Sequence, residues 1–329
     1  MLPVVASLLG TVAATAVVVG PVVATGDAAT TRAVPSPTTV GDGAYAFARD
    51  LAADGPRPAA SAAERAGQRA AAARFRSAGL AVSYDRFAVP GKGRSRNVVA
   101  RRPGRSSCLR IFMAHADSTP TAPGALDNAS GVGLLVALAP VLAAAPAPRC
   151  ETWLVATGAE ERLFTGRPDH LGASALVRRL RREGRTRDVR WALSLDEVGA
   201  GSRFDLYSPA RRARASVEGE VLASARAAGV RVRRVRDGGT GNSDHREIEL
   251  AGMPGMKLGV VAHACRHTPC DTAGQLRKGA FRRVASVVVP LVRAGAPVAA
   301  TSVSSRSSAP VPAGRRPDPD APARPAEAR

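Results

Sequence analysis

The chain has 329 residues, of which 45% are hydrophobic and 4% aromatic, and its formal net charge is +20. This hydrophobic content supports a sizeable core and excludes a wholly disordered protein. Nearly all the basic residues are arginines dispersed among alanine, glycine and proline, and no aromatic residues interleave with them, so we expect no nucleic-acid partner.

The first 26 residues carry no charged side chain and are rich in valine, alanine and leucine. This segment resembles a secretory signal peptide that ends at Val22-Val23-Ala24, so we predict that residues 1–24 are removed. The run also reaches the length of about 20 residues that spans a bilayer, so an uncleaved anchor is the alternative. We expect a secreted protein without a stable membrane partner after signal removal, or else a membrane-anchored form.

Four cysteines, an even number without a Cys-x-x-Cys pair, fit an exported protein with disulfides. Cys108 and Cys150 each precede an apolar, strand-like run, and neighbouring strands would bring them within bridging distance. Cys265 and Cys270 flank His267 and would close a small loop around it. We expect these two disulfides, and four buried thiols are the alternative.

The composition predicts a linker over residues 25–41, a folded domain over 42–294 and a disordered tail over 295–329, which has almost no large apolar residue. Helical patterns cover residues 42–79, with a break at Gly55-Pro56. The other expected helices are 129–145, 171–183, 211–228 and 273–293, and the expected strands are 82–87, 97–101, 109–115, 152–158, 189–195, 203–207, 230–235 and 256–261. This alternation predicts a single three-layer α/β domain whose mixed, mostly parallel central sheet is covered by helices on both faces.

Polar residues follow the apolar run that begins at Ile111, where a sheet gives way to loops. Residues two apart in a strand point to the same side, so Asp117 can accept one ring N–H of His115 and leave the other nitrogen for a metal. Asp127 follows, just before an expected helix. One histidine and one carboxylate do not make a zinc site, so other segments must supply partners.

The ends of the later strands supply them. Glu160 and Glu161 follow one apolar strand, Asp196 and Glu197 end the next, and the last leads to His263 and to a loop that contains His267. The carboxyl ends of parallel strands share one sheet edge, so these side chains should meet. Together with His115 they form the mixed nitrogen and oxygen ligand set of a pair of bridged zinc ions.

Each segment has a simpler alternative when taken alone. His115 with Asp117 would be a hydrogen-bonded core pair, and Glu160-Glu161 would be an exposed acidic loop. His245, after a glycine-rich loop, either shapes a substrate pocket or orients the loop. We interpret His170 and His263 as structural, because neither has a ligand partner by spacing.

Over about residues 45–292 the chain resembles the co-catalytic dizinc aminopeptidases, metallopeptidase family twenty-eight of clan MH. The resemblance rests on the order and spacing of six motifs, which are His115-x-Asp117, Gly124 to Gly131, Glu160-Glu161, Asp196, Ser243-Asp244-His245 and His267 to Thr272.

This resemblance implies a zinc-exopeptidase fold that hydrolyses N-terminal residues from peptides with two zinc ions per chain. By this resemblance His115 and Asp196 would bind one zinc, Glu161 and His267 the other, and Asp127 would bridge the two. Glu160 would be the general base that acts on a metal-bridging water. Asp117 would support His115. Members of the family often have a cis peptide bond just after the bridging aspartate, so the bond after Asp127 is expected to be cis.

One position departs from the family pattern, because Arg266 stands where some members have a tyrosine that stabilises the oxyanion. Arg266 would act electrostatically or face solvent.

Glutaminyl cyclases, which use one zinc on the same fold, are the alternative function, and an inactive exported binding protein is a third. We expect a monomer that acts on peptides. The sequence leaves open whether the enzyme acts as an aminopeptidase, a carboxypeptidase or a dipeptidase, and which substrate side chain it prefers.

Overall fold

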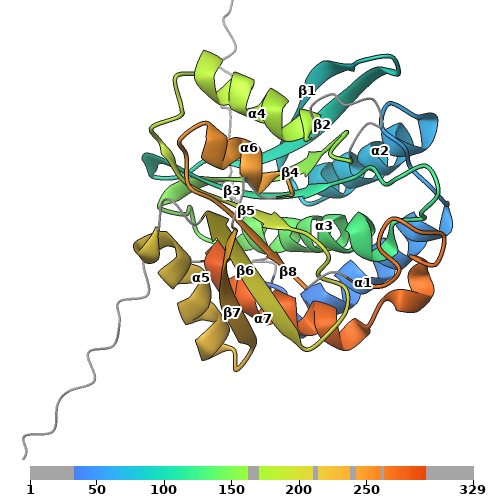
Figure 1. The fold of residues 1–329 in the computed structure, drawn as a ribbon. Helices are drawn as coiled ribbons and strands as arrows, with labels where there is room; N and C mark the ends of the chain where they lie inside the picture. The colour runs from blue at the N-terminus through green and yellow to red at the C-terminus, as the bar shows by residue number, and fades with distance from the viewer. Residues whose placement is uncertain (1–32, 162–169, 210–213, 238–241, 261–262, 294–329) are drawn as a thin grey trace, which may run out of the picture. The chain divides into compact units, whose positions relative to one another are not determined.

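In the computed structural model (Figure 1), five stretches of the chain are described, namely residues 33–161, 170–209, 214–237, 242–260 and 263–293. Contacts divide the chain into two units, Met1–Ala33 and Val34–Arg329, and every element below lies in the second. The predicted signal segment 1–24 and the predicted tail 295–329 lie outside the described residues.

The predicted linker over residues 25–41 runs too far, because helix α1 (Pro37–Ala53) begins inside it. The Ser36 side chain accepts a hydrogen bond from the Thr39 N–H, and Pro37 occupies the first helical turn. Serine before a helix and proline at its first position are ordinary start signals. Serine and proline are also typical of linkers, so composition alone does not distinguish a linker from the start of a helix.

The central sheet of the described residues has eight strands in the order β1-β2-β4-β3-β5-β8-β6-β7. Their bounds are β1 Ala81–Val89, β2 Gly93–Arg102, β3 Ser106–His115, β4 Cys150–Thr157, β5 Val189–Leu195, β6 Arg203–Pro209, β7 Arg231–Asp237 and β8 Gly255–Gly259. Strands β4, β3, β5 and β8 are parallel to one another, and β6 is parallel to β7. The antiparallel pairs are β1 with β2, β2 with β4 and β6 with β8. The expected mixed, mostly parallel sheet is confirmed.

Helices cover both faces of this sheet (Figure 1). One face carries α1, α3 (Ser130–Ala144), α5 (Ala215–Ala227) and α7 (Lys278–Arg293), with α2 (Ala62–Ser77) packed between α3 and β2. The other face carries α4 (Leu171–Arg182) and the short α6 (His245–Leu250). Two short turns, η1 (Ala125–Ala129) and η2 (Ala273–Gln275), complete the described elements. Helix α6 was not expected from the sequence, because six residues are too few to set up a helical periodicity.

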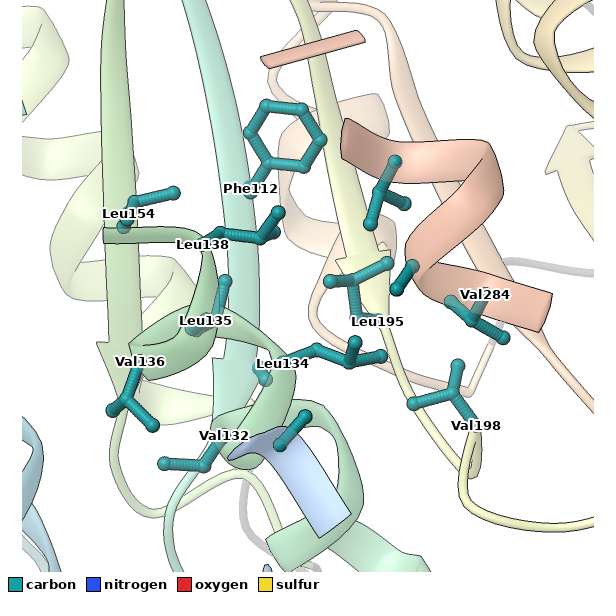
Figure 2. Packing of buried hydrophobic residues seen from close by; sticks show 14 of the residues in the cluster. Phe112, Val132, Leu134, Leu135, Val136, Leu138, Leu154, Leu195, Val198 and Val284 are labelled. Carbon is teal, nitrogen blue, oxygen red and sulfur yellow. The ribbon is translucent and has the colours of Figure 1, made fainter. Parts of the chain in front are cut away.

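The main core lies between the sheet and α3, where Phe112, Leu134, Leu138 and Leu195 are buried together (Figure 2). The segment Ala125–Ala144 is long and apolar enough to cross a membrane, but its most apolar part is 89% buried inside the fold, as in a core helix. Helix α3 is therefore buried along most of its length, which anchors the turn that precedes it.

The first turn of α3 approaches the end of β5 very closely. A Cβ atom added at Gly131 would lie 2.0 Å from the Leu195 carbonyl oxygen, so no larger residue fits there. The Asn128 side chain donates a hydrogen bond to the same carbonyl. This close packing sets Asp127 beside the carboxyl ends of β3 and β5.

Both expected disulfides are present. Cys108–Cys150 joins the adjacent parallel strands β3 and β4, and Cys265–Cys270 closes the loop after β8. Strand pairing explains the first, since both cysteines lie at the starts of neighbouring strands.

Replacing Cys108 and Cys150 together by alanine should lower the free energy of unfolding by about 2–4 kcal/mol, because the bridge constrains a long loop of the unfolded chain. Urea unfolding measures this. Replacing Cys265 and Cys270 is the matched control, with a smaller expected loss because their loop is short. Equal losses for the two pairs would contradict the explanation by loop length.

Candidate metal centre

A cluster of acidic residues and histidines lies at the carboxyl ends of the central strands. His115 ends β3, Glu160 and Glu161 follow β4, and Asp196 follows β5, and all four are buried. Asp127 comes from the turn before α3 and is also buried. His267, from the loop after β8, leaves 44% of its side chain exposed and so forms the open side of the cluster.

The Asp127 carboxylate lies between two histidines. Its Oδ1 is 3.0 Å from His115 Nε2, and its Oδ2 is 3.1 Å from His267 Nε2. A second carboxylate accompanies each histidine: Asp196 Oδ1 lies 3.6 Å from His115 Nε2, and Glu161 Oε2 lies 3.1 Å from His267 Nε2. The five residues that the sequence predicts as metal ligands therefore converge, with Asp127 in the middle.

Donor atoms from these residues are close enough to share a cation. Two groups in the described part of the chain bring their ligand atoms within 4.8 Å of one another: His115 with Asp127 and Glu161, and His115 with Glu160 and Asp196. His115 Nε2, Glu161 Oε1 and Asp196 Oδ1 are buried without a hydrogen bond of normal geometry to the described residues. Buried polar atoms without partners are costly, and imidazole with carboxylate is a usual donor set for zinc. The residues present thus fit Zn²⁺.

The charges of the cluster favour a cation. Burial lowers the pKa of His115, but the surrounding carboxylates, with Glu160 foremost, raise it more, so that it ends well above its usual value. Hydrogen bonds to Asp127 and Glu161 raise the pKa of His267 to about 10. Burial and the neighbouring Asp127 charge raise the pKa of Glu161 to about 8. The site stabilises added positive charge, as a metal centre must.

Asp117 supports the cluster in a different way from the one expected. His115 Nδ1 lies 3.2 Å from the backbone carbonyl oxygen of Asp117 and 3.7 Å from its carboxylate. The carboxylate instead accepts the backbone N–H groups of Glu160, at 3.1 Å, and Glu161, at 3.0 Å. The carbonyl still directs the Nδ1 proton of His115 and leaves Nε2 for a metal, while the carboxylate holds the Glu160-Glu161 loop.

Two histidines that we interpreted as structural contact the cluster or its supports. His170 Nε2 lies 3.3 Å from Glu160 Oε1. Burial lowers the pKa of His170, but Glu160 and Glu247 raise it to about 10. His263 Nε2 lies 3.4 Å from Glu197 Oε1, beside the cluster. The His263–Glu197 contact joins segments that are far apart in the sequence, so no spacing pattern predicts it.

Asp244 is a further buried group that sequence reasoning did not single out by itself. It accepts a hydrogen bond from the Thr157 hydroxyl at the end of β4. Burial and the nearby Glu160 charge raise its pKa to about 7. Its place in the Ser243-Asp244-His245 motif is the signal that could have identified it.

The two residues expected to contact substrate lie in different environments. Arg266 Nε is 3.2 Å from Asp127 Oδ2 and 3.7 Å from Glu197 Oε1, so its side chain faces the cluster rather than solvent. His245 is buried, and its Nε2 lies 2.9 Å from Asp237 Oδ2 at the end of β7. This contact fits the loop-orienting alternative for His245.

Unusual backbone conformations gather around the cluster. Ala159, Glu197 and His267 have φ angles of +50°, +58° and +59°, in the left-handed region that non-glycine residues rarely adopt. The Asp127–Asn128 peptide bond is cis, as expected. Non-glycine residues with φ angles in the left-handed region are found preferentially at functional sites.

Comparison with known proteins identifies one family. The sequence profile described as Peptidase family M28 matches residues 97–292. A search of curated proteins found no match.

Solved structures with the same fold include two kinds of enzyme. The zinc aminopeptidase BSAP from Bacillus subtilis has a TM-score of 0.70 and 18% identity, over 79% of this chain and 95% of that one. A leucine aminopeptidase precursor from Bacteroides thetaiotaomicron has a TM-score of 0.68 and 22% identity, over 79% and 98%. Porphyromonas gingivalis glutaminyl cyclase has a TM-score of 0.67 and 23% identity, over 78% and 99%. At these identities the likeness establishes the fold.

Replacing Asp117 by asparagine should lower zinc affinity by about 10- to 100-fold. The asparagine NH₂ group, a donor, would face one of the two backbone N–H groups that now donate to the Asp117 carboxylate. Zinc titration against a competing chelator measures this. Asp188→Asn, on a surface turn, is the control. Unchanged zinc affinity in Asp117→Asn would contradict the supporting role.

Proposed function

The chain belongs to peptidase family M28, and from this premise we propose that it is a zinc-dependent aminopeptidase that hydrolyses N-terminal residues from peptides. The observation that carries the proposal is the position of Asp127, whose two carboxylate oxygens each lie about 3 Å from a different histidine. A carboxylate in this position can bridge two metal ions.

In this proposal two zinc ions share the cluster. His115 and Asp196 would hold one, and Glu161 and His267 would hold the other, with Asp127 common to both. Zinc supplies Lewis-acid chemistry when bound, since it lowers the pKa of a coordinated water to about 7 and polarises a carbonyl group.

Glu160 is the proposed general base. Its Oε1 faces His170 at 3.3 Å, and its Oε2 points toward the cluster, 3.9 Å from His115 Nε2. One oxygen is thus held by a histidine while the other is directed at the place where a water proton must be accepted. Glu160 would take that proton and pass it to the leaving amine.

Arg266 and the carboxylates at the mouth of the site would handle the substrate. A free α-amine is positive and suits a cluster with excess negative charge. The Arg266 guanidinium, held beside Asp127, can donate to a developing oxyanion through its remaining N–H groups. Arg266 would then take the role for which some family members use tyrosine.

A single-zinc glutaminyl cyclase is the second candidate function. It is favoured by the glutaminyl cyclases among the structural neighbours, whose TM-scores are close to those of the aminopeptidases. The two histidines on opposite oxygens of Asp127 favour two metals and hence the peptidase.

We also propose that the protein is secreted and acts as a monomer on peptides, without a nucleic-acid or stable membrane partner. The two disulfides support an oxidising compartment. The uncharged N-terminal segment supports export.

The purified protein, dialysed against metal-free buffer, should retain close to two zinc ions per chain and release free amino acids from peptides. Elemental analysis and an amino-acid release assay measure these. One zinc with cyclisation of N-terminal glutamine would select the cyclase. A protein that binds no zinc even when zinc is added would overturn the proposal.

Replacing Glu160 by glutamine should preserve the zinc content and reduce turnover by about 10²- to 10⁴-fold, the loss typical of removing a general base. Glu161→Gln is the matched control at the adjacent position, where we expect zinc itself to be lost. Near-normal turnover in Glu160→Gln would refute its role as the base.

A further inference from the structure

Lys257, one of three lysines in the chain, is buried directly behind the proposed metal centre. Its Nζ lies 3.0 Å from Asp196 Oδ2 and 3.3 Å from Glu197 Oε2. Only 3% of the Lys257 side chain is exposed. A charged ammonium group tolerates such burial only when carboxylates surround it, and here two do.

Strand pairing holds this contact in place. Lys257 lies opposite Ser194 in the parallel pair β5 and β8, and the Asp196 N–H donates to the Leu258 carbonyl. The backbone on both sides of the ion pair is therefore set by the sheet. Lys257 contacts Asp196 Oδ2, whereas His115 lies beside Oδ1.

The contact divides the two oxygens of Asp196 between different partners. Oδ2 is occupied by Lys257, while Oδ1 lies 3.6 Å from His115 Nε2 and makes no hydrogen bond to a described residue. Rotation of the carboxylate would break the bond to Lys257. Asp196 is thus directed to offer one oxygen, Oδ1, to a metal held with His115.

Glu197 also balances the charge of Lys257, but its second oxygen faces Arg266 and His263 instead of His115. Its Oε2 contacts Lys257, and its Oε1 lies 3.7 Å from Arg266 Nε and 3.4 Å from His263 Nε2. Glu197 therefore links Lys257 to Arg266 and His263.

We propose that Lys257 is a positioning residue that holds Asp196 as a one-oxygen ligand for the zinc shared with His115. The inference rests on the proposed zinc site. It assigns a ligand-orienting function to a residue that would otherwise only neutralise Glu197 and join β5 to β8.

The test replaces Glu197 and Lys257 together by methionine, which removes both charges and leaves neither group buried alone. It is made in a His267→Ala background, where the His115–Asp196 position is the zinc site that remains. Zinc affinity, measured with a competing chelator, should fall by about 10- to 100-fold relative to His267→Ala, the usual loss when the partner of a ligand is removed.

Two further variants separate orientation from charge balance. Glu197→Met alone leaves Lys257 on Asp196 and should keep zinc affinity within about threefold of the background. Lys257→Arg retains a donor to Asp196 and should recover most of the affinity lost in the double variant. If Glu197→Met alone lowers affinity as much as the double variant does, the inference is overturned.

A distant ion pair controls for general damage to the fold. Arg179 and Asp85, paired at 3.1 Å between α4 and β1, are replaced by methionine and leucine in the same background. Zinc affinity should not change, and circular dichroism checks that every variant is folded. A folded Glu197→Met, Lys257→Met variant with unchanged affinity would overturn the role of Lys257. A wild-type chain that binds no zinc would instead overturn the proposed function.

Discussion

The buried carboxylate of Asp127, placed between two histidines, is the interaction on which the site depends. A buried negative charge requires compensation, and here His115 and His267 reach it from opposite sides. The backbone around it is held equally firmly, because Asp271 accepts the N–H groups of Leu126 and Asp127 at 2.8 and 3.1 Å. The loop that carries His267 thus also supports the turn that carries Asp127.

The sheet supplies the rest of the geometry through one repeated arrangement. The ends of β4 and β5 deliver acidic residues, and a buried group from a neighbouring strand supports each of these ends. Asp117, just beyond β3, holds the Glu160-Glu161 loop after β4 through two backbone hydrogen bonds. Lys257 on β8 contacts Asp196 after β5. The reactive edge is therefore supported by polar contacts between neighbouring strands, which explains why these polar groups are buried.

A sequence pattern is ambiguous where a residue type has more than one structural use. Proline and serine near Pro37 indicated a linker, but the same residues start helix α1. Asp117 was expected to receive the His115 ring proton on its carboxylate, whereas its carbonyl oxygen lies closer. His170 was interpreted as structural because it has no ligand partner by spacing, and its Nε2 lies 3.3 Å from Glu160 Oε1.

The sequence by itself determined the alternation of strands and helices and the acidic and histidine residues that meet at one sheet edge, and it suggested the two cysteine pairings that the structure confirms. These follow from hydrophobic periodicity, from the burial of parallel strands and from the order of the motifs. Only the tertiary structure decided which oxygen of Asp127 faces which histidine, and that Lys257 lies behind Asp196. Those contacts depend on side-chain directions and distances between neighbouring strands, and a linear pattern of residue types does not contain them.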